Sequence, residues 1–166
     1  GPDEPIVRPA ASSNLHYEGE LAIVIGRICK DVPEQRAQEV IFGFTVANDV
    51  TARDLQNSDG HWLRAKGADT FCPLGPWMVT HFSIAEASHR QIVTRLGGKE
   101  VQHGNTDQMI HTIPKLISYI SSFMTLLPGD VILTGTPAGV GPMELGQRVE
   151  VEIEGIGTLT NTVVGA

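Results

Sequence analysis

Residues 16–26 read HYEGELAIVIG, a stretch in which two acids stand at the head of an apolar run. Successive side chains of a β-strand point to opposite faces, so Glu18 and Glu20 share a face with Ala22. Both faces become apolar after the second acid, a pattern typical of a strand that is covered on both sides. The sequence therefore predicts a buried strand over Leu21–Ile25 whose two leading carboxylates point the same way as buried residues.

The composition limits the class of protein. A chain of 166 residues suits a single domain with a core, predicted over residues 1–166. The net charge of −7, from 12 basic and 19 acidic residues, argues against a nucleic acid or an anionic membrane as partner. Cys29 and Cys72 have no metal or redox spacing. With no signal peptide and no membrane-spanning apolar run in this sequence, we expect reduced thiols and a cytoplasmic protein.

The remaining pattern predicts mostly strands and one clear helix. Thr112–Phe123 has Pro114 in its first turn and apolar residues at helical spacing. The pair Gly97-Gly98 predicts a hairpin within Ile92–Val101. Further strands are expected at Phe42–Val50, Phe71–Thr80 (an edge strand, because of its prolines), Val131–Thr134, Arg148–Ile153 and Thr158–Val164, with a short helix at Pro33–Ile41 and a long loop at 53–70. Strands and helices do not alternate regularly, which favours a β-dominated α+β domain.

A third acid could join the two glutamates. Asp49 ends the apolar strand in VANDV, residues 46–50. Three carboxylates that converge at strand ends would form an all-oxygen site suited to Mg²⁺ or Mn²⁺, whereas zinc prefers His or Cys. The alternative is that the glutamates begin a solvated strand and that Asp49 is a turn residue. The pattern alone leaves both interpretations open.

Two other stretches carry polar groups of interest. The segment after Asp49 contains Arg53, Gln56, Arg64 and Lys66, and a cation near a metal could hold a substrate carboxylate or stabilise an enolate oxygen. Local pattern favours a solvated loop instead. The glycine-rich LTGTPAGVG, residues 133–141, could bring backbone amides to an anion, or could simply form a tight turn.

Five stretches together resemble the fumarylacetoacetate hydrolase family. They read YEGELAIVIGR, GFTVANDVTARDLQ, RAKGADTFCPLGPW, GNTDQMIHTIPKLISYISSFMTLLPGDVILTGTPAGVG and VEVEIEGIGTL, in the family's order and over nearly the whole chain. The resemblance implies a mixed β-sandwich roll of the fumarylacetoacetate hydrolase C-terminal-domain type.

The resemblance also implies a site. Its expected metal ligands for Mg²⁺ or Mn²⁺ are Glu18, Glu20 and Asp49, its catalytic lysine is Lys66, and its substrate-binding residues are Arg53, Gln56, Lys66 and Thr136. The lysine is expected to contact the oxyanion or carboxylate of the substrate, and the threonine is expected beside the substrate carboxylate.

The implied function is that of a metal-dependent enzyme on small 2-oxo or 2-hydroxy-enoic acids. The match most resembles isomerases or decarboxylases of the 2-hydroxyhepta-2,4-diene-1,7-dioate type in the degradation of aromatic compounds. Acylpyruvate (C–C bond) hydrolases and oxaloacetate decarboxylases share the same motifs. A catalytically silent metal- or ligand-binding domain is the alternative from another class. The resemblance also suggests a homodimer.

One departure from the family pattern affects the expected chemistry. Members usually carry an upstream segment with a lid helix, whose His and Glu activate water or shuttle a proton. Only 17 residues precede Glu18, and none of them forms that pattern. We therefore expect this chain to lack the upstream segment and its acid/base pair. A further hypothesis is a structural subunit whose partner supplies the lid.

Overall fold

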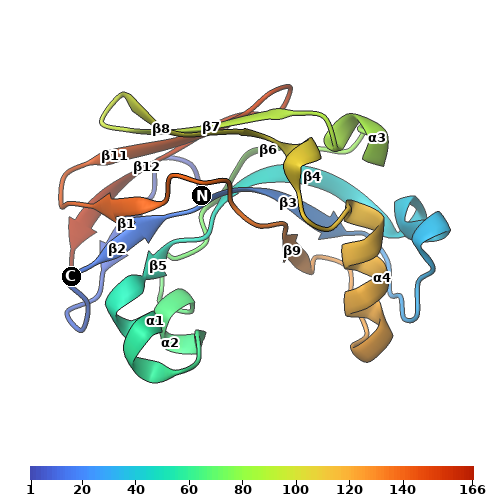
Figure 1. The fold of residues 1–166 in the computed structure, drawn as a ribbon, viewed down its shortest axis with the longest axis horizontal. Helices are drawn as coiled ribbons and strands as arrows, with labels where there is room; N and C mark the ends of the chain where they lie inside the picture. Colours follow the sequence, from blue (N-terminus) through green and yellow to red (C-terminus); the bar gives the residue numbers. More distant parts are fainter.

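The computed structural model describes all of residues 1–166 and is built mainly of β-strands in three sheets (Figure 1). The strands are β1 (Pro5–Arg8), β2 (Leu15–Tyr17), β3 (Gly19–Ile25), β4 (Ile41–Asn48), β5 (Thr51–Ala52), β6 (Leu74–Val79), β7 (Gln91–Leu96), β8 (Lys99–Asn105), β9 (Val131–Leu133), β10 (Gly141–Met143), β11 (Arg148–Ile153) and β12 (Gly157–Gly165). The sheet orders are β1-β12-β11-β7-β8, β6-β4-β3-β9 and β10-β2-β5. This architecture confirms the predicted β-dominated α+β class.

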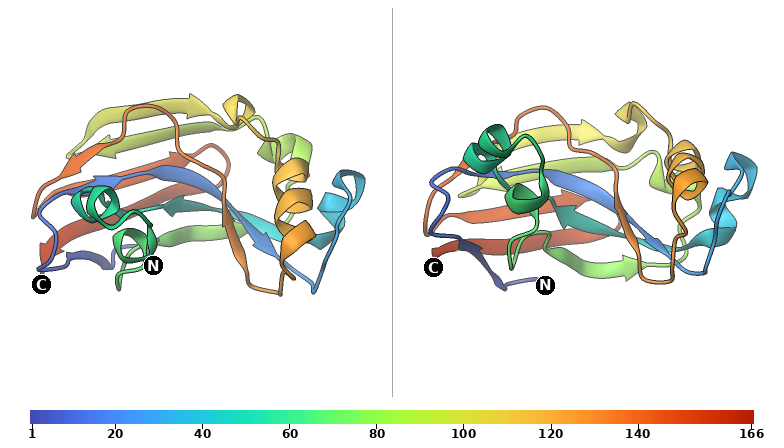
Figure 2. Two further views of the ribbon diagram at one scale, coloured as in Figure 1. Left: turned by 60° about the horizontal axis from the view of Figure 1, so that its bottom comes forward. Right: turned by 90° about the horizontal axis from the view of Figure 1, so that it is seen from below.

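The helices are short and lie at the two ends of the molecule. They are η1 (Glu34–Val40), α1 (Arg53–Asp59), α2 (Leu63–Lys66), α3 (Ile84–Ala87), η2 (Thr106–Gln108) and α4 (Ile113–Phe123). In Figure 1 the sheets form an arch, with α1 and α2 as one arm below it and α4 as the other. The rotated views of Figure 2 also show these two arms well apart. No helix is both long and apolar enough to cross a membrane.

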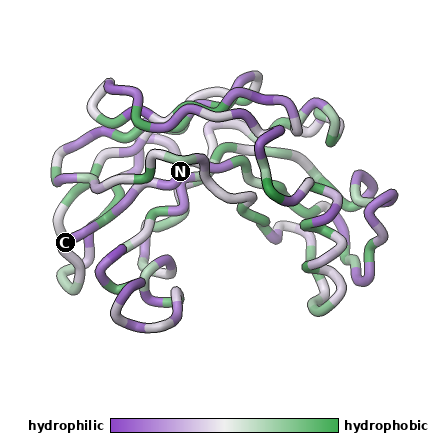
Figure 3. The backbone as a smooth tube through the Cα atoms, viewed as in Figure 1, coloured by the Kyte–Doolittle hydropathy of each residue, from purple (hydrophilic) through white to green (hydrophobic).

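Strand β3 is the centre of the fold. Every residue of β3 is buried, and the strand pairs with β4 on one side and β9 on the other. The larger part of the core lies between β3, β4 and the five-stranded sheet, and includes Leu21, Phe44 and Val151. Apolar colours accordingly follow the central strands in Figure 3, while hydrophilic colours predominate on α1. The prediction of a strand covered on both faces is confirmed.

The glycine between the two glutamates faces the five-stranded sheet. A Cβ atom on Gly19 would lie 2.4 Å from Thr94 Oγ1 and 2.9 Å from Val151 Cγ1. Both neighbours are fully buried, so they have little room to move. Only glycine therefore allows β3 to approach β7 and β11 this closely, and the alternation of the strand turns Glu18 and Glu20 to the opposite face.

Most predicted elements are present, and the errors are local. Helix α4, the β7–β8 hairpin around Gly97-Gly98 and the edge position of β6 confirm the predictions. The predicted helix at Pro33–Ile41 is a 3₁₀-helix, η1. The long loop predicted at 53–70 is wrong, because this segment forms α1 and α2. Neither helix carries a long apolar stripe, so tertiary contacts rather than local periodicity determine them.

Candidate functional site

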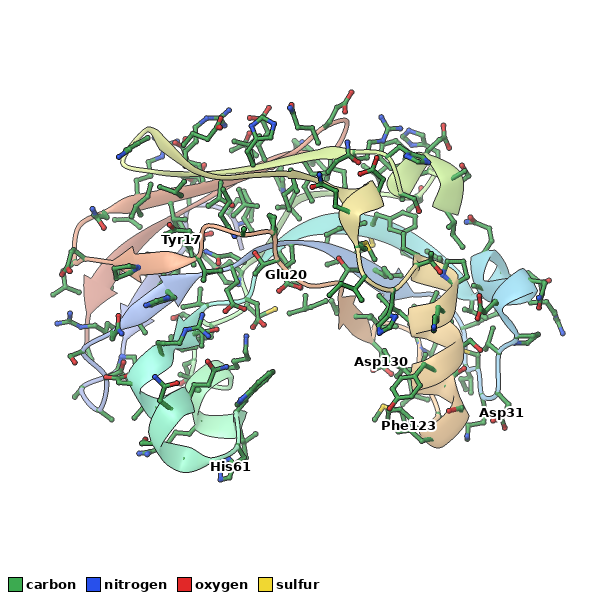
Figure 4. All side chains as sticks on the ribbon, viewed as in Figure 1. Tyr17, Glu20, Asp31, His61, Phe123 and Asp130 are labelled. Atoms are coloured by element: carbon green, nitrogen blue, oxygen red, sulfur yellow. The ribbon has the colours of Figure 1, made fainter.

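Three carboxylates meet where β3 begins and β4 ends. Glu18, Glu20 and Asp49 each offer an oxygen atom within 4.8 Å of the other two. Strand pairing brings them together, since the Asp49 N–H donates to the Glu18 carbonyl oxygen at 2.8 Å. The Glu20 side chain is almost fully buried, and Figure 4 shows it on the inner side of the arch, between the two arms. The structure thus brings together the three acids expected to bind metal.

Lys66 lies between two of these carboxylates. Its Nζ donates to Glu18 Oε2 at 3.0 Å, to Asp49 Oδ2, and to Thr51 Oγ1 at 2.9 Å. The lysine belongs to α2, in the segment for which the sequence predicted a loop. Burial lowers the pKa of Lys66, but its hydrogen bonds to Asp49 and Glu18 outweigh burial, and the net pKa is raised. The side chain therefore keeps its proton at neutral pH and is not a proton acceptor.

Arg53 supplies a second cation. It is the first residue of α1, and its guanidinium group donates to Glu18 Oε1 and to Gln56 Oε1, one helical turn later. Gln56 thus orients the Arg53 side chain and makes no hydrogen bond to the carboxylates. Arg64 lies outside the site, because its exposed side chain pairs with Asp59 at 2.7 Å.

The charges of the site leave one negative charge in excess when all five groups are ionised. Burial raises the pKa of Glu20 to about 7; the nearby Asp49 and Glu18 add to this, while a hydrogen bond from the Gly135 N–H opposes it. Burial also raises the pKa of Asp49, against the effect of its hydrogen bond to Lys66. A hard divalent cation would relieve this repulsion, and the all-oxygen donor set fits Mg²⁺ or Mn²⁺ better than zinc.

The loop after β9 is tied to β3 residue by residue. Thr134 Oγ1 donates to the Leu21 carbonyl oxygen at 2.8 Å, and the Gly135 N–H donates to Glu20 Oε2 at 2.6 Å. Thr136 Oγ1 donates to the carbonyl oxygen of the glycine at position 19 at 2.8 Å. Thr136 is therefore bound to the backbone between the two glutamates, and its hydroxyl proton is already used within the protein. Its contact with a substrate carboxylate stays a prediction.

Three polar residues of the site were not singled out from the sequence. Asn48 Oδ1 accepts from the Glu18 N–H at 2.9 Å, and Thr51 Oγ1 accepts from Lys66. Gln102 reaches the same region from β8 and is 1% exposed. The available signal was the inward position of Gln102 in its strand, since a polar side chain directed into a core requires partners.

Cys72 also lies near the carboxylates, but its surroundings do not activate the thiol. Burial raises the pKa of its thiol, and the negative charges of Asp49 and Glu20 add to the effect. The thiol therefore remains protonated at neutral pH, whereas a nucleophilic cysteine needs a lowered pKa.

A cavity of about 520 Å³ adjoins the site at Gly135 and Thr136, but the three carboxylates do not line it. Most of its polar side chains already have local partners. His103 contacts Gln91 and Glu100, and Gln108 Oε1 accepts from a backbone N–H of its own capping turn. We therefore assign the chemistry to the carboxylate cluster and not to this cavity.

The affinity of the protein for Mn²⁺ should fall about tenfold for each pH unit below 7. A metal must compete with the proton that Glu20 holds below its pKa of about 7. Titrations between pH 5.5 and 8.5, in which electron paramagnetic resonance gives the concentration of free Mn²⁺, measure this dependence. Asp59→Asn is the control, since Arg64 already holds the pKa of Asp59 at about 2. A flat affinity between pH 5.5 and 7 would contradict the prediction.

Comparison with known proteins adds a family. The family model described as "Fumarylacetoacetate (FAA) hydrolase C-terminal" matches residues 1–164. Protein Rv2993c of Mycobacterium tuberculosis is 58% identical over 164 residues, which cover 99% of this chain and 62% of that protein. The mitochondrial oxaloacetate tautomerase FAHD2A of Homo sapiens is 44% identical over 173 residues, which cover 99% of this chain and 55% of that protein. The chain thus spans less than two thirds of the length of these relatives.

Two solved structures are similar to the whole fold. The 2-hydroxyhepta-2,4-diene-1,7-dioate isomerase of Mycobacterium marinum superposes with a TM-score of 0.96 at 56% identity, over 99% of this chain and 64% of that one. The fumarylpyruvate hydrolase of Pseudomonas aeruginosa, in complex with Mn²⁺ and pyruvate, superposes with a TM-score of 0.92 at 34% identity, over 99% of this chain and 72% of that one. Both likenesses confirm the expected roll.

Proposed function

This chain belongs to the fumarylacetoacetate hydrolase family, and on this premise we propose that it carries the metal site of an enzyme acting on small 2-oxo or 2-hydroxy-enoic acids. The observation that carries the proposal is the buried cluster of Glu18, Glu20 and Asp49, in which three acids face only two cations. An acid with a pKa raised to about 7 in such a cluster is typical of a functional site.

The three acids would hold Mg²⁺ or Mn²⁺. When bound, such an ion would act as a Lewis acid that draws negative charge onto the 2-oxo group and so favours an enolate. The structure of the Pseudomonas relative in complex with Mn²⁺ and pyruvate supports a divalent ion and a 2-oxo acid as ligands. Both ions suit this site, because both prefer oxygen ligands.

The cations of the site would bind and orient the substrate. Lys66 keeps its proton and has a flexible stem, so it can turn from the carboxylates to a carboxylate or oxyanion of the substrate. Arg53, held by Gln56, would keep Glu18 in place and add positive charge. Neither residue is proposed as a base.

We favour isomerisation over hydrolysis as the reaction. The isomerase of Mycobacterium marinum is 56% identical to the chain, whereas relatives named as hydrolases are 43% and 34% identical. Both reactions share an enolate, but isomerisation needs only a proton transfer, and hydrolysis also needs an activated water. The 2-hydroxyhepta-2,4-diene-1,7-dioate type therefore remains the first choice, followed by acylpyruvate hydrolysis or decarboxylation of oxaloacetate.

An ultraviolet assay tests this function. Acetylpyruvate, oxaloacetate and a 2-hydroxy-dienoate are each incubated with the protein and Mn²⁺, with and without EDTA. We expect loss of the dienoate absorbance that EDTA abolishes. Loss of acetylpyruvate alone would instead indicate the hydrolase branch. Mn²⁺ binding without turnover on any substrate would favour the silent metal-binding domain.

Lys66→Met is expected to lower turnover about 100-fold or more, because a positioned cation at a developing oxyanion contributes on this scale. The matched control is Lys99→Met, which removes an exposed lysine at the start of β8. The comparison is the initial rate at saturating Mn²⁺. Equal rates for Lys66→Met and the unaltered protein would remove Lys66 from the proposed machinery.

Two further expectations come from the family and the free thiols. We propose a homodimer, which sedimentation velocity at two protein concentrations tests. Neither Cys29 nor Cys72 is in a disulfide. We place the protein in a reducing compartment such as the cytoplasm.

A further inference from the structure

Gln102 makes every one of its side-chain hydrogen bonds to the two segments that frame the carboxylates. Its Oε1 accepts from the Gly19 N–H at 3.1 Å. Its Nε2 donates to Thr136 Oγ1 and to the Pro137 carbonyl oxygen, both at 2.8 Å. The residue belongs to β8, a strand of another sheet, and is 1% exposed. Removing this buried amide would leave three buried polar groups without their hydrogen-bond partner.

We infer that Gln102 is a positioning residue for the metal site proposed above. It joins the backbone between Glu18 and Glu20 to the loop whose Gly135 N–H binds the Glu20 carboxylate. Thr136 completes a closed arrangement, since its hydroxyl accepts from Gln102 and donates to the Gly19 carbonyl oxygen. Gln102 thereby fixes the orientation of the two glutamate side chains although it contacts neither of them.

The geometry around Gly19 explains why an amide is needed at this point. Thr94 lies directly opposite Gln102 in the β7–β8 pairing, and both flank the glycine. The Thr94 hydroxyl has no hydrogen-bond partner in the chain, so it does not fix the backbone of β3. Gln102 has both an acceptor and two donor hydrogens, and it can therefore bind the N–H of one segment and the oxygen atoms of the other.

Gln102→Met tests the inference, because methionine has nearly the same volume and no amide. We expect the dissociation constant for Mn²⁺ at 25 °C to rise about 10- to 100-fold, the range typical of residues that orient metal ligands. The signal of bound Mn²⁺ in electron paramagnetic resonance should also broaden, since the glutamates lose a single orientation. Both readouts are taken well below the unfolding temperature of the variant.

Ser121→Ala is the matched control for lost stability. Ser121 is fully buried in α4, and its hydroxyl accepts from the Val32 N–H at 3.0 Å, away from the carboxylates. It should lower the unfolding temperature and leave the Mn²⁺ affinity unchanged. Unchanged affinity and signal in Gln102→Met would overturn the inference. No Mn²⁺ binding by the unaltered protein would instead overturn the proposed function, and the inference with it.

A milder variant keeps the test decisive if Gln102→Met does not fold. Thr136→Val removes the hydroxyl that links Gln102 to Gly19, and we expect it to weaken Mn²⁺ binding about threefold to tenfold. If both variants fold, the double variant should bind Mn²⁺ within about twofold of Gln102→Met, because coupled residues are not additive. Full additivity, or unchanged affinity in Thr136→Val, would contradict the coupling.

Discussion

Glu20→Gln should abolish Mn²⁺ binding and yet make the metal-free protein more stable above pH 7. The carboxylate is expected to be a ligand, and an amide oxygen is a far weaker ligand for a hard cation, so affinity should fall more than about 100-fold. The gain in stability follows from the pKa of Glu20, which burial raises from 4.5 to about 7.

The sign of the stability change follows from proton linkage. The folded chain holds a proton on Glu20 that the unfolded chain releases near pH 4.5. The stability from this proton is complete below pH 4.5 and is lost as pH rises through 7. Glutamine has no charge to lose, so at pH 8 the variant should be more stable by up to about 3 kcal/mol. This corresponds to at most roughly 6–12 °C in unfolding temperature for a chain of this size.

Thermal unfolding at pH 8, with EDTA and with Mn²⁺, measures both effects. In EDTA the variant should unfold at the higher temperature. With Mn²⁺ at 1,000 times its dissociation constant the order should reverse, since the ligand then stabilises the unaltered protein by about 4.1 kcal/mol, more than the variant gains. Glu39→Gln is the control, because Glu39 lies in an exposed ion pair with Arg36. Equal Mn²⁺ affinity in Glu20→Gln and the unaltered protein would contradict the assignment of Glu20 as a metal ligand.

Gly19→Ala is expected to destabilise the protein by about 2–4 kcal/mol, although it adds a single methyl group. The new Cβ would lie 2.4 Å from Thr94 Oγ1 and 2.9 Å from Val151 Cγ1, inside the contact between two sheets. Relief requires β3 to move, and Glu18 and Glu20 move with it. Mn²⁺ affinity should therefore fall together with stability. Urea unfolding and Mn²⁺ titration of the same samples measure the two losses.

Two comparisons separate this clash from a general effect of alanine. Gly98→Ala meets no atom within 4 Å and changes only a hairpin residue at φ +81°, so it should cost about 1 kcal/mol. Thr94→Ala removes the nearest clashing atom, and in combination with Gly19→Ala it should restore more than half of the lost stability. Thr94→Val keeps an atom at that position and should not. Equal costs for Gly19→Ala and Gly98→Ala would contradict the packing argument.

Local pattern was sufficient for the elements whose own residues decide their structure. The spacing of apolar residues predicted α4, and Gly97-Gly98 predicted the turn between β7 and β8. Alternation along β3 correctly placed Glu18 and Glu20 on one face, since the period of a strand is a property of its backbone. Helices α1 and α2 were not predicted, because helices of seven and four residues depend on contacts with the rest of the fold.

The sequence by itself determined most of the longer strands, the shared face of Glu18 and Glu20, and a family resemblance that pointed to Asp49 and Lys66. Only the tertiary structure decided which charges meet and what protonation they take. Lys66 reaches Glu18 from 48 residues away, and Gln102 reaches Gly19 from 83 residues away. Such partners follow from how the sheets pack, and the pKa of Glu20 follows from the water that this packing excludes. Neither distance in space nor loss of solvent is a local property of the chain.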